Sequence, residues 1–386
     1  MRLAALDRLR SQSCNPKKLG VVASPQGVCL SCAVASERER ARCRERLTTL
    51  MSAGLDPGTL RYEIVTELKH RVGFDRWAWP LADPDSLITL AGIAEHDYGR
   101  AIPRLLELEY GGDDFAGMRS VARRRSAVGS LTVETRGDYA RSPRWDEVLR
   151  PVGIGDEVVV ACRDDFGCWG WLKAYRGQDE QPFDEQDLRL FAEIAPLLGA
   201  GLRRSLAVGL GAPAPVNRPP GILLLDNDLH AVSETATWRG WTDSLPGANA
   251  YSAFGMLPAM VYPVATLVRS QASGFAVHAL ERAEDGGWVV IEGAALEGGG
   301  KARFAVTMRY GGSGETFDRL CRLYGLTARE RQVVAAIFTG LETPSVSARL
   351  SISRHTIQDH LKSIFSKVGV HSRRELVARF GRPVDA

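Results

Sequence analysis

The stretch RHTIQDHLKSIFSKV (354–368) has the pattern of an amphipathic helix. Four apolar residues recur at helical spacing and define one face: Ile357, Leu361, Ile364 and Val368. The opposite face carries hydrogen-bonding and charged side chains: Arg354, His355, Gln358, Asp359, Lys362 and Ser363. Ser353 precedes this helix as a cap and Gly369 ends it. Such a helix can pack against neighbours on one side and offer donors and acceptors to base edges on the other.

Two further helices are predicted just before this one. In LTARERQVVAAIFTG (326–340), Thr327 and Glu330 have the spacing of a capping box, and Gly340 ends the apolar pattern. A short helix follows at 344–350, with Thr343 as its cap and a proline in its first turn. The sequence therefore predicts helices packed in succession up to the amphipathic segment.

A fourth helix and a basic charge complete this end of the chain. Ser372 and Glu375 form a second capping box in front of an apolar pattern. From Leu326 onward there are ten basic and five acidic residues, a local net charge of about +5 against +3 for the whole chain. A locally basic four-helix segment is typical of modules that bind phosphate backbones.

Residues 326–380 resemble the LuxR-type helix-turn-helix family. The resemblance rests on LTARE, on Gly-Leu at 340–341, on SRHTIQDHLKSIFSKVGV and on SRREL. It implies an all-α four-helix module that binds double-stranded DNA as a homodimer, with the fourth helix at the dimer contact. The run ETPSVS at 342–347 departs from the Ser-Asn-Lys-Glu-Ile-Ala pattern usual in the family, which puts the length of the second helix in question.

The resemblance also assigns roles to individual residues. Thr356 and Lys367 match positions that touch the phosphate backbone, while Gln358 and Lys362 lie where bases could be read. His360 matches a histidine that is frequent in the family. The complete predicted DNA-binding set is Ser353, Arg354, His355, Thr356, Gln358, Asp359, Lys362 and Lys367.

Upstream, residues 46–206 resemble a GAF-type sensor domain of α+β class. The pattern contains a helix at 60–72, strands at 156–164 and 167–177, and a helix at 183–206 capped by Asp184. The resemblance implies small-molecule binding or dimerisation. Tryptophans could line a pocket for an effector, or could simply form the core: Trp77, Trp79, Trp145, Trp169 and Trp171.

The remaining divisions follow from composition. Residues 207–221 are rich in Gly and Pro and are predicted to be a linker. Residues 222–310 predict an antiparallel meander that resembles a PAS-like sheet, and 311–320 a second linker before the DNA-binding domain at 321–386. The whole chain is therefore predicted to be a multidomain α+β protein.

Residues 1–45 are predicted to be a leader that bears cysteines and could be flexible. Cys14, Cys29, Cys32 and Cys43 include one C-x-x-C pair, so a metal site is possible, but free thiols in a loose leader are the simpler interpretation. Cys162 and Cys168 lie on adjacent predicted strands and could serve a GAF-fold thiol enzyme or be small buried residues.

These patterns favour one function over its rivals. There is no apolar run long enough for a membrane span and no secretory signal, so we expect a cytoplasmic protein without a membrane partner. No cofactor is predicted, and no acid–base constellation accompanies the cysteines, so we expect no enzymatic activity. The sequence predicts a DNA-binding transcription regulator controlled by a small molecule or conformational signal. The alternatives are a redox- or metal-responsive regulator, a thiol enzyme, and a protein that uses the last helices only for dimerisation.

Overall fold

A computed structural model describes residues 30–74, 76–95, 98–112, 114–210, 218–270, 277–298 and 300–380. The chain divides into two compact units, residues 1–42 and 43–386. Helix α1 (Leu30–Ser52) begins in the first unit and ends in the second. None of the helices in the described ranges is both long and apolar enough to span a bilayer.

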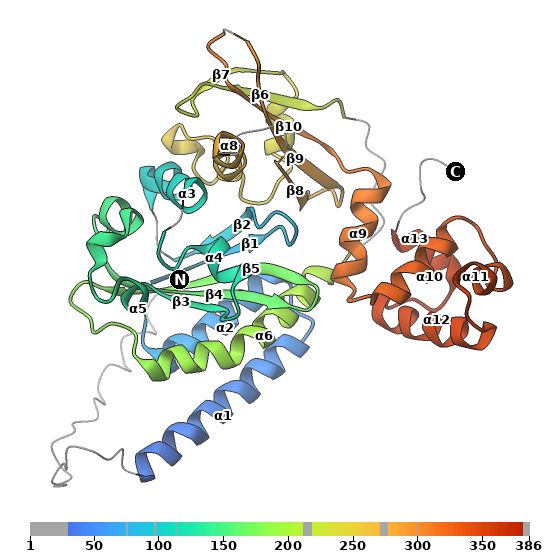
Figure 1. Ribbon diagram of the computed structural model, residues 1–386, viewed down its shortest axis with the longest axis horizontal. Helices are drawn as coiled ribbons and strands as arrows, with labels where there is room; N and C mark the ends of the chain where they lie inside the picture. Colours follow the sequence, from blue (N-terminus) through green and yellow to red (C-terminus); the bar gives the residue numbers. More distant parts are fainter. Residues whose placement is uncertain are drawn as a thin grey trace, which may run out of the picture. The chain divides into compact units, whose positions relative to one another are not determined.

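The first sheet contains five antiparallel strands in the order β2-β1-β5-β4-β3 (Figure 1). Its strands are β1 (Arg76–Ala82), β2 (Thr89–Ala94), β3 (Val128–Ser130), β4 (Ile154–Asp164) and β5 (Gly167–Gly177). The β4–β5 hairpin closes on the Asp164–Gly167 pair, at the turn that the sequence predicted. This hairpin is the longest pairing in the sheet and forms its centre.

Helices cover both faces of this sheet. Helices α2 (Pro57–Val72) and α6 (Glu185–Ala207) pack with Trp77 and Trp79 of β1 in one core cluster. Ala78, which points the opposite way in the strand, belongs to a second cluster with Ile102 and Leu105 of α3 (Ile102–Gly111). Two short helices, α4 (Met118–Arg123) and α5 (Leu131–Thr135), lie between α3 and β4 in the chain.

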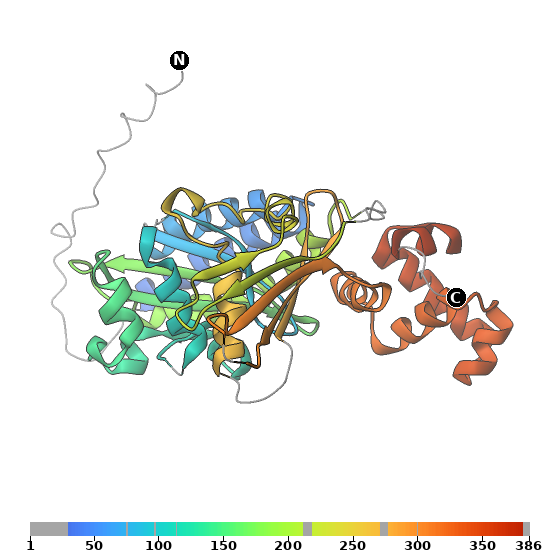
Figure 2. The same cartoon turned by 90° about the horizontal axis from the view of Figure 1, so that it is seen from above.

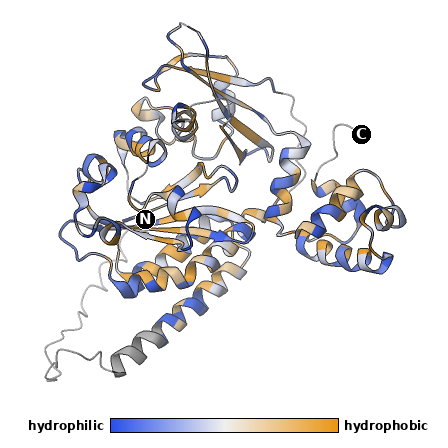
Figure 3. Ribbon diagram, in the orientation of Figure 1, coloured by the Kyte–Doolittle hydropathy of each residue, from blue (hydrophilic) through white to orange (hydrophobic). Residues whose placement is uncertain are grey.

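The second sheet repeats the strand order of the first. Its strands are β6 (Gly221–Leu225), β7 (Ala231–Glu234), β8 (Val277–Arg282), β9 (Trp288–Ala295) and β10 (Phe304–Tyr310), in the order β7-β6-β10-β9-β8. In both sheets the first strand is therefore flanked by the second and the fifth. Helix α7 (Trp238–Thr242) contacts β6, and α8 (Val261–Ser270) packs across β8, β9 and β10. Figure 3 shows hydrophobic residues along the strands of both sheets.

The C-terminal part is entirely helical. It contains α9 (Ser313–Leu323), α10 (Ala328–Phe338), α11 (Thr343–Leu350), α12 (Arg354–Val368) and α13 (Arg373–Phe380). Figure 2 shows α10 to α13 packed against one another as a cluster of red helices. The four helices predicted after residue 325 are confirmed.

The predicted linker at 311–320 was wrong, because most of it belongs to α9. Glu315 accepts a hydrogen bond from the Gly312 amide at 2.7 Å and so caps the helix. Phe317 then packs on the rings of Phe338 and Phe380, at centroid distances of 5.8 and 5.7 Å. These contacts hold a glycine-rich start in a helical conformation, which local composition could not indicate.

The predicted leader at 1–45 also ends too late, since α1 is helical from Leu30 onward. Cys43 is buried in the same core cluster as Leu47 and Leu198. Of the predicted linker at 207–221, residues 211–217 lie outside the described residues. The structure thus places Cys43, which the sequence left in the leader, in the core of the first α+β domain.

A close approach of α6 to β4 depends on one glycine. A Cβ on Gly199 would collide with the backbone of Arg163. We expect Gly199→Ala to destabilise the chain by about 1–3 kcal/mol, because helix and strand must separate to make room. Differential scanning calorimetry of the full chain measures this effect. Gly240→Ala is the matched control, because Gly240 also lies in a helix but has open space around it; equal effects of the two substitutions would contradict the prediction.

Candidate nucleic-acid interface

Helix α12 begins and ends where its local sequence predicts. The Ser353 hydroxyl accepts a hydrogen bond from the Thr356 amide at 3.0 Å, which caps the first turn. Gly369 adopts a positive φ of 70°, and its amide donates to the Phe365 carbonyl at 2.9 Å. Both ends of the helix are thereby fixed without help from other parts of the chain.

Two faces of α12 differ sharply in burial. Ile357, Ile364 and Val368 are buried, at 1%, 0% and 3% exposure. The exposed side chains on the other face are Arg354, His355, Gln358, Asp359 and Lys362. Figure 3 shows hydrophilic residues along this helix. The exposed face of α12 can therefore offer several hydrogen-bonding side chains to one ligand.

A groove borders the same helix. It has a volume of about 600 Å³ and is lined by Gln358 and Lys362, by the apolar Leu361 and Phe365, and by residues up to His371. Within the exposed face, His355 Nε2 lies 3.8 Å from Asp359 Oδ2, one helical turn away. Arg354, Gln358 and Lys362 supply the remaining polar groups of this face, so it carries both donors and acceptors.

Glu330 connects α12 to α10 through a buried carboxylate. Its Oε2 accepts from the Thr327 amide at 2.7 Å, which completes the predicted capping box. Ser363 Oγ donates to Oε1 at 2.6 Å, and Lys367 Nζ donates to Oε2 at 2.6 Å. Burial alone would raise the pKa of Glu330, but these hydrogen bonds, led by that from Lys367, lower it to about 2. The contacts of Ser363 and Lys367 with Glu330 hold the C-terminal half of α12 against α10.

Arginines secure the other connections of the bundle. Arg329 donates to the Leu350 carbonyl at the end of α11, at 2.6 Å. Arg373, the first residue of α13, donates to the carbonyl of Leu341. The predicted cap of α11 was one residue off, because Glu342 is the N-cap and the helix begins at Thr343. Helix α11 nevertheless forms, with Val346 buried at 1% exposure, so the unusual ETPSVS run does not abolish it.

Comparison with known proteins agrees with this geometry. Residues 325–380 match the model of the family described as "Bacterial regulatory proteins, luxR family". This segment is a LuxR-type helix-turn-helix domain. The match covers α10 to α13 and leaves the two sheets outside it.

Curated relatives match short stretches of this chain. The probable transcriptional regulatory protein SgaR of Hyphomicrobium methylovorum is 45% identical over 56 residues, 14% of this chain and 26% of that protein. The monoamine regulon transcriptional regulator of Klebsiella aerogenes is 40% identical over 58 residues, 15% of this chain and 26% of that protein. The chain thus spans about a quarter of the length of these curated relatives. A crystal structure described as a VqmA–ligand–DNA complex from Vibrio cholera aligns with 43% of this chain and 85% of its own, with 18% identity and a TM-score of 0.18.

The structure brings most of the predicted DNA-binding residues onto one helix. Ser353 caps α12 and lies at its start, with Thr356 half-buried one turn later. Lys367 differs from the others, since its ammonium is bound to Glu330 and its side chain is 33% exposed. The sequence singled out Glu330 as a capping residue but did not reveal this ion pair, which joins positions 37 residues apart.

The tryptophans predicted for a ligand pocket lie in hydrophobic cores. Trp77, Trp79 and Trp169 belong to one core cluster and Trp171 to the other, each at most 2% exposed. Trp169 also borders a cavity described below. Trp145 is half-buried and stacks on Tyr139 at a centroid distance of 5.3 Å. The core interpretation accounts for the four buried indoles better than a shared pocket does.

The two cysteines of the β4–β5 hairpin, Cys162 and Cys168, have buried thiols. Burial raises the pKa of Cys162 well above its ordinary value and that of Cys168 to about 12, so both thiols stay protonated near neutral pH. Cys14 and Cys29 lie outside the described residues, as does the Cys32 side chain. Within the described ranges, Asp226, Asp228 and His230 form a group with metal-ligand types, but Asp226 Oδ1 already accepts the amides of the other two in a turn.

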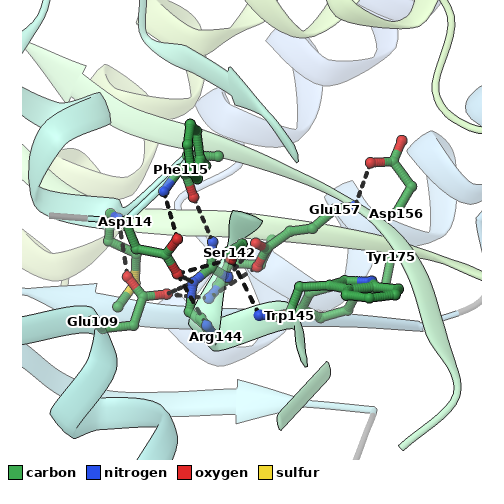
Figure 4. Close-up of polar contacts among 12 residues, drawn as sticks. Glu109, Asp114, Phe115, Ser142, Arg144, Trp145, Asp156, Glu157 and Tyr175 are labelled. Carbon is green, nitrogen blue, oxygen red and sulfur yellow. Dashed lines mark hydrogen bonds and ion pairs between the residues drawn. The ribbon is translucent and has the colours of Figure 1, made fainter. Parts of the chain in front are cut away.

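Sequence reasoning missed a cluster of buried charges in the first α+β domain (Figure 4). We call it the Arg144 cluster; it consists of Glu109, Asp114, Arg144, Glu157 and Lys173. Arg144 is fully buried and pairs with Glu157, and its Nε lies 3.3 Å from Asp114 Oδ2. Lys173 Nζ lies 2.7 Å from Glu109 and 3.0 Å from Glu157. The five residues come from separate parts of the sequence, so no local sequence pattern predicts that they lie together.

Proposed function

We propose that the protein is a sequence-specific transcription regulator that binds double-stranded DNA through α12. The observation that carries the proposal is the division of this helix into a buried apolar face and an exposed face with Arg354, Gln358 and Lys362. A helix of this kind fits the major groove, where such side chains can discriminate bases. The match of residues 325–380 to the luxR family supports the same conclusion.

We further propose that the two sheets are sensor domains, GAF-like for residues 46–206 and PAS-like for 222–310. Their identical strand order supports a common role. Binding as a homodimer would present two copies of α12 to half-sites about one helical turn apart. Leu376 and Phe380 of α13 are buried within the domain itself, so a dimer contact through α13 would use its other, exposed side chains, among them Arg374 and Ala378.

Selection of bound DNA from a random duplex pool, with the full chain, tests the proposal. We expect enrichment of an inverted repeat and an affinity that falls steeply with salt, because phosphate contacts release counterions. An absence of binding even at low salt would refute the proposal. Enrichment of a single half-site without an inverted repeat would support DNA binding but would refute binding as a homodimer.

Substitutions on α12 separate base recognition from general affinity. We expect Gln358→Ala and Lys362→Ala each to lower the preference for the selected site over random DNA by about 5- to 100-fold, because each removes a side chain placed for direct contact. Fluorescence anisotropy with selected and random duplexes measures this ratio. Gln332→Ala is the matched control, since Gln332 is exposed on α10; its preference should be unchanged. Equal losses on both duplexes for the α12 variants would contradict the assigned roles.

A further inference from the structure

A cavity of about 410 Å³ lies where the two sheets meet α9. We call it the Glu281 cavity. Its walls are mainly apolar and include Leu81 and Trp169 from the first sheet, Trp288 from the second, Leu206 from α6 and Leu323 from α9. A space of this size is in the range that holds a small organic molecule.

Glu281 lines this cavity and carries an unsatisfied acidic oxygen. The side chain is 4% exposed, and its Oε1 accepts from the Ala91 amide at 2.9 Å. Its Oε2 is buried and accepts no hydrogen bond from any described residue. Burial raises the pKa of this carboxyl to about 7, and the single amide hydrogen bond offsets only part of the effect. An orphaned polar atom of this kind is costly, and a bound donor would relieve the cost.

Arg61 provides a complementary positive group in the same cavity. It is 5% exposed, and it donates to the Pro57 carbonyl at 2.9 Å and to the Trp79 carbonyl at 2.6 Å. No carboxylate in the described part of the chain forms an ion pair with it. Burial lowers the pKa of the guanidinium to about 10, but the group stays charged at neutral pH. Its remaining donors are suited to an anionic oxygen.

The cavity also touches the helix that leads into the LuxR-type domain. Arg319 of α9 lines it and donates to the Leu280 carbonyl at 3.1 Å and to the buried Asp83 carboxylate. Asp83 in turn accepts from the Leu280 amide at 2.8 Å. An occupant would therefore contact the point where both sheets hold α9 through Arg319, eight residues before the N-cap of α10.

We propose that the Glu281 cavity binds a small zwitterion with an apolar body, which is the chemistry of a hydrophobic α-amino acid. Its ammonium group donates to Glu281 Oε2, its carboxylate accepts from Arg61, and its side chain packs on the leucines and tryptophans of the wall. Among the described residues, Glu281 and Arg61 are the buried acid and base of the lining without ionic partners, whereas Arg282 is half-buried and Glu284 is exposed. This buried pair balances a ligand of zero net charge, and an ion of either sign would leave one of the two unpaired. That the ligand then alters DNA binding rests on the function proposed above.

Isothermal titration calorimetry with the full chain and no DNA tests the site. The probes are L-phenylalanine, L-leucine, 2-phenylethylamine, which lacks the carboxylate, and 3-phenylpropionate, which lacks the amine. We expect both amino acids to bind, and each analogue with one charged group to bind about 10-fold more weakly or worse, because a buried partner is left unpaired. An absence of binding by both amino acids at millimolar concentration would overturn the proposal, as would equal affinity for all four probes.

Variants assign the contact to Glu281. Glu281→Gln keeps the shape of the side chain. It is expected to weaken the binding of L-phenylalanine about 10-fold and to leave the affinity for 3-phenylpropionate unchanged. Glu297→Gln is the matched control, because Glu297 is exposed on the same sheet domain; it should bind as the native chain does. Undiminished binding of L-phenylalanine by Glu281→Gln would refute the assignment. Because no DNA is present, failure here leaves the DNA-binding function standing, and a DNA titration with and without L-phenylalanine then tests the coupling separately.

Discussion

Arg144→Met is expected to unfold the first α+β domain at a much lower temperature than the native chain, with a loss of about 3–5 kcal/mol. Arg144 is 0% exposed, and its guanidinium lies among the carboxylates of Glu109, Asp114 and Glu157 (Figure 4). The charges of these carboxylates outweigh the effect of burial and raise the pKa of Arg144 above its ordinary value. Without the guanidinium, Lys173 is the one cation among the described residues that still pairs with Glu109 and Glu157, and Asp114 has no ion pair left, so some of these carboxylates must become protonated or reach water.

Urea unfolding of the full chain, followed by near-ultraviolet circular dichroism, measures the loss. The free energy of unfolding of Arg144→Lys should lie between those of the native chain and of Arg144→Met. An ammonium keeps the positive charge but lacks the planar guanidinium that donates to several partners at once. Arg150→Met is the control, since Arg150 is exposed and pairs with Asp146 one turn away at 2.8 Å; its loss should stay below about 1 kcal/mol. Equal stability of the two Met variants would show that the Arg144 cluster contributes little.

The LuxR-type domain was predictable because its signals are local. The Thr327–Glu330 box, the Ser353 cap and the Gly369 terminus all act within four residues, and each forms as expected. The apolar spacing of α12 correctly identified Ile357, Ile364 and Val368 as buried, whereas Leu361, predicted on the same face, is half-buried and borders the groove. The same holds for the β4–β5 hairpin and for Asp184, which caps α6 with a box closed by Asp187.

What escaped prediction depends on contacts that are distant in sequence. Gly-Gly-Ser-Gly-Glu at 311–315 has the composition of a linker, but α9 begins at Ser313, held by the Glu315 cap and by the packing of Phe317 on α10 and α13. The tryptophans illustrate a different limit. Alternation along β1 places Trp77 and Trp79 on one face, but it does not say whether helices or a ligand cover that face. Helices α2 and α6 cover it.

The buried charges illustrate the strongest limit. Glu109, Arg144 and Lys173 belong to residue types that are rarely buried, so a sequence pattern assigns them to the surface. Glu281 is similar, because it is the penultimate residue of β8 and a charged side chain there is typical of an exposed strand end. For the Arg144 cluster the informative property is the presence of ion-pair partners from other helices and strands, and for Glu281 it is the lack of one among the described residues. That property emerges only when the sheets and helices are placed together.

Glu330→Ala is expected to destabilise the LuxR-type domain by about 2–4 kcal/mol, because it removes a cap and two buried side-chain hydrogen bonds at once. Three donors converge on this carboxylate: the Thr327 amide, Ser363 Oγ and Lys367 Nζ. Without it, α12 loses its polar attachment to α10, and DNA affinity should fall on all sequences. Hydrogen exchange of the α12 amides in the full chain measures the loss in this domain. Glu342→Ala is the control, because Glu342 is exposed and makes no side-chain cap.

The acid response of the domain gives an independent test of the same contact. The pKa of Glu330 is lowered from 4.5 to about 2, so its contribution to stability is complete above about pH 4.5 and is lost as the pH falls towards 2. We expect the native domain to lose protection of its α12 amides over this interval, and Glu330→Gln to be weaker at neutral pH but less sensitive to acid. If the native chain and Glu330→Gln lost protection in parallel, Glu330 would not be the group that titrates. Lys367→Met should then distinguish the roles of the lysine: a loss of protection without DNA marks the ion pair, whereas a change only in DNA affinity and its salt dependence marks a phosphate contact.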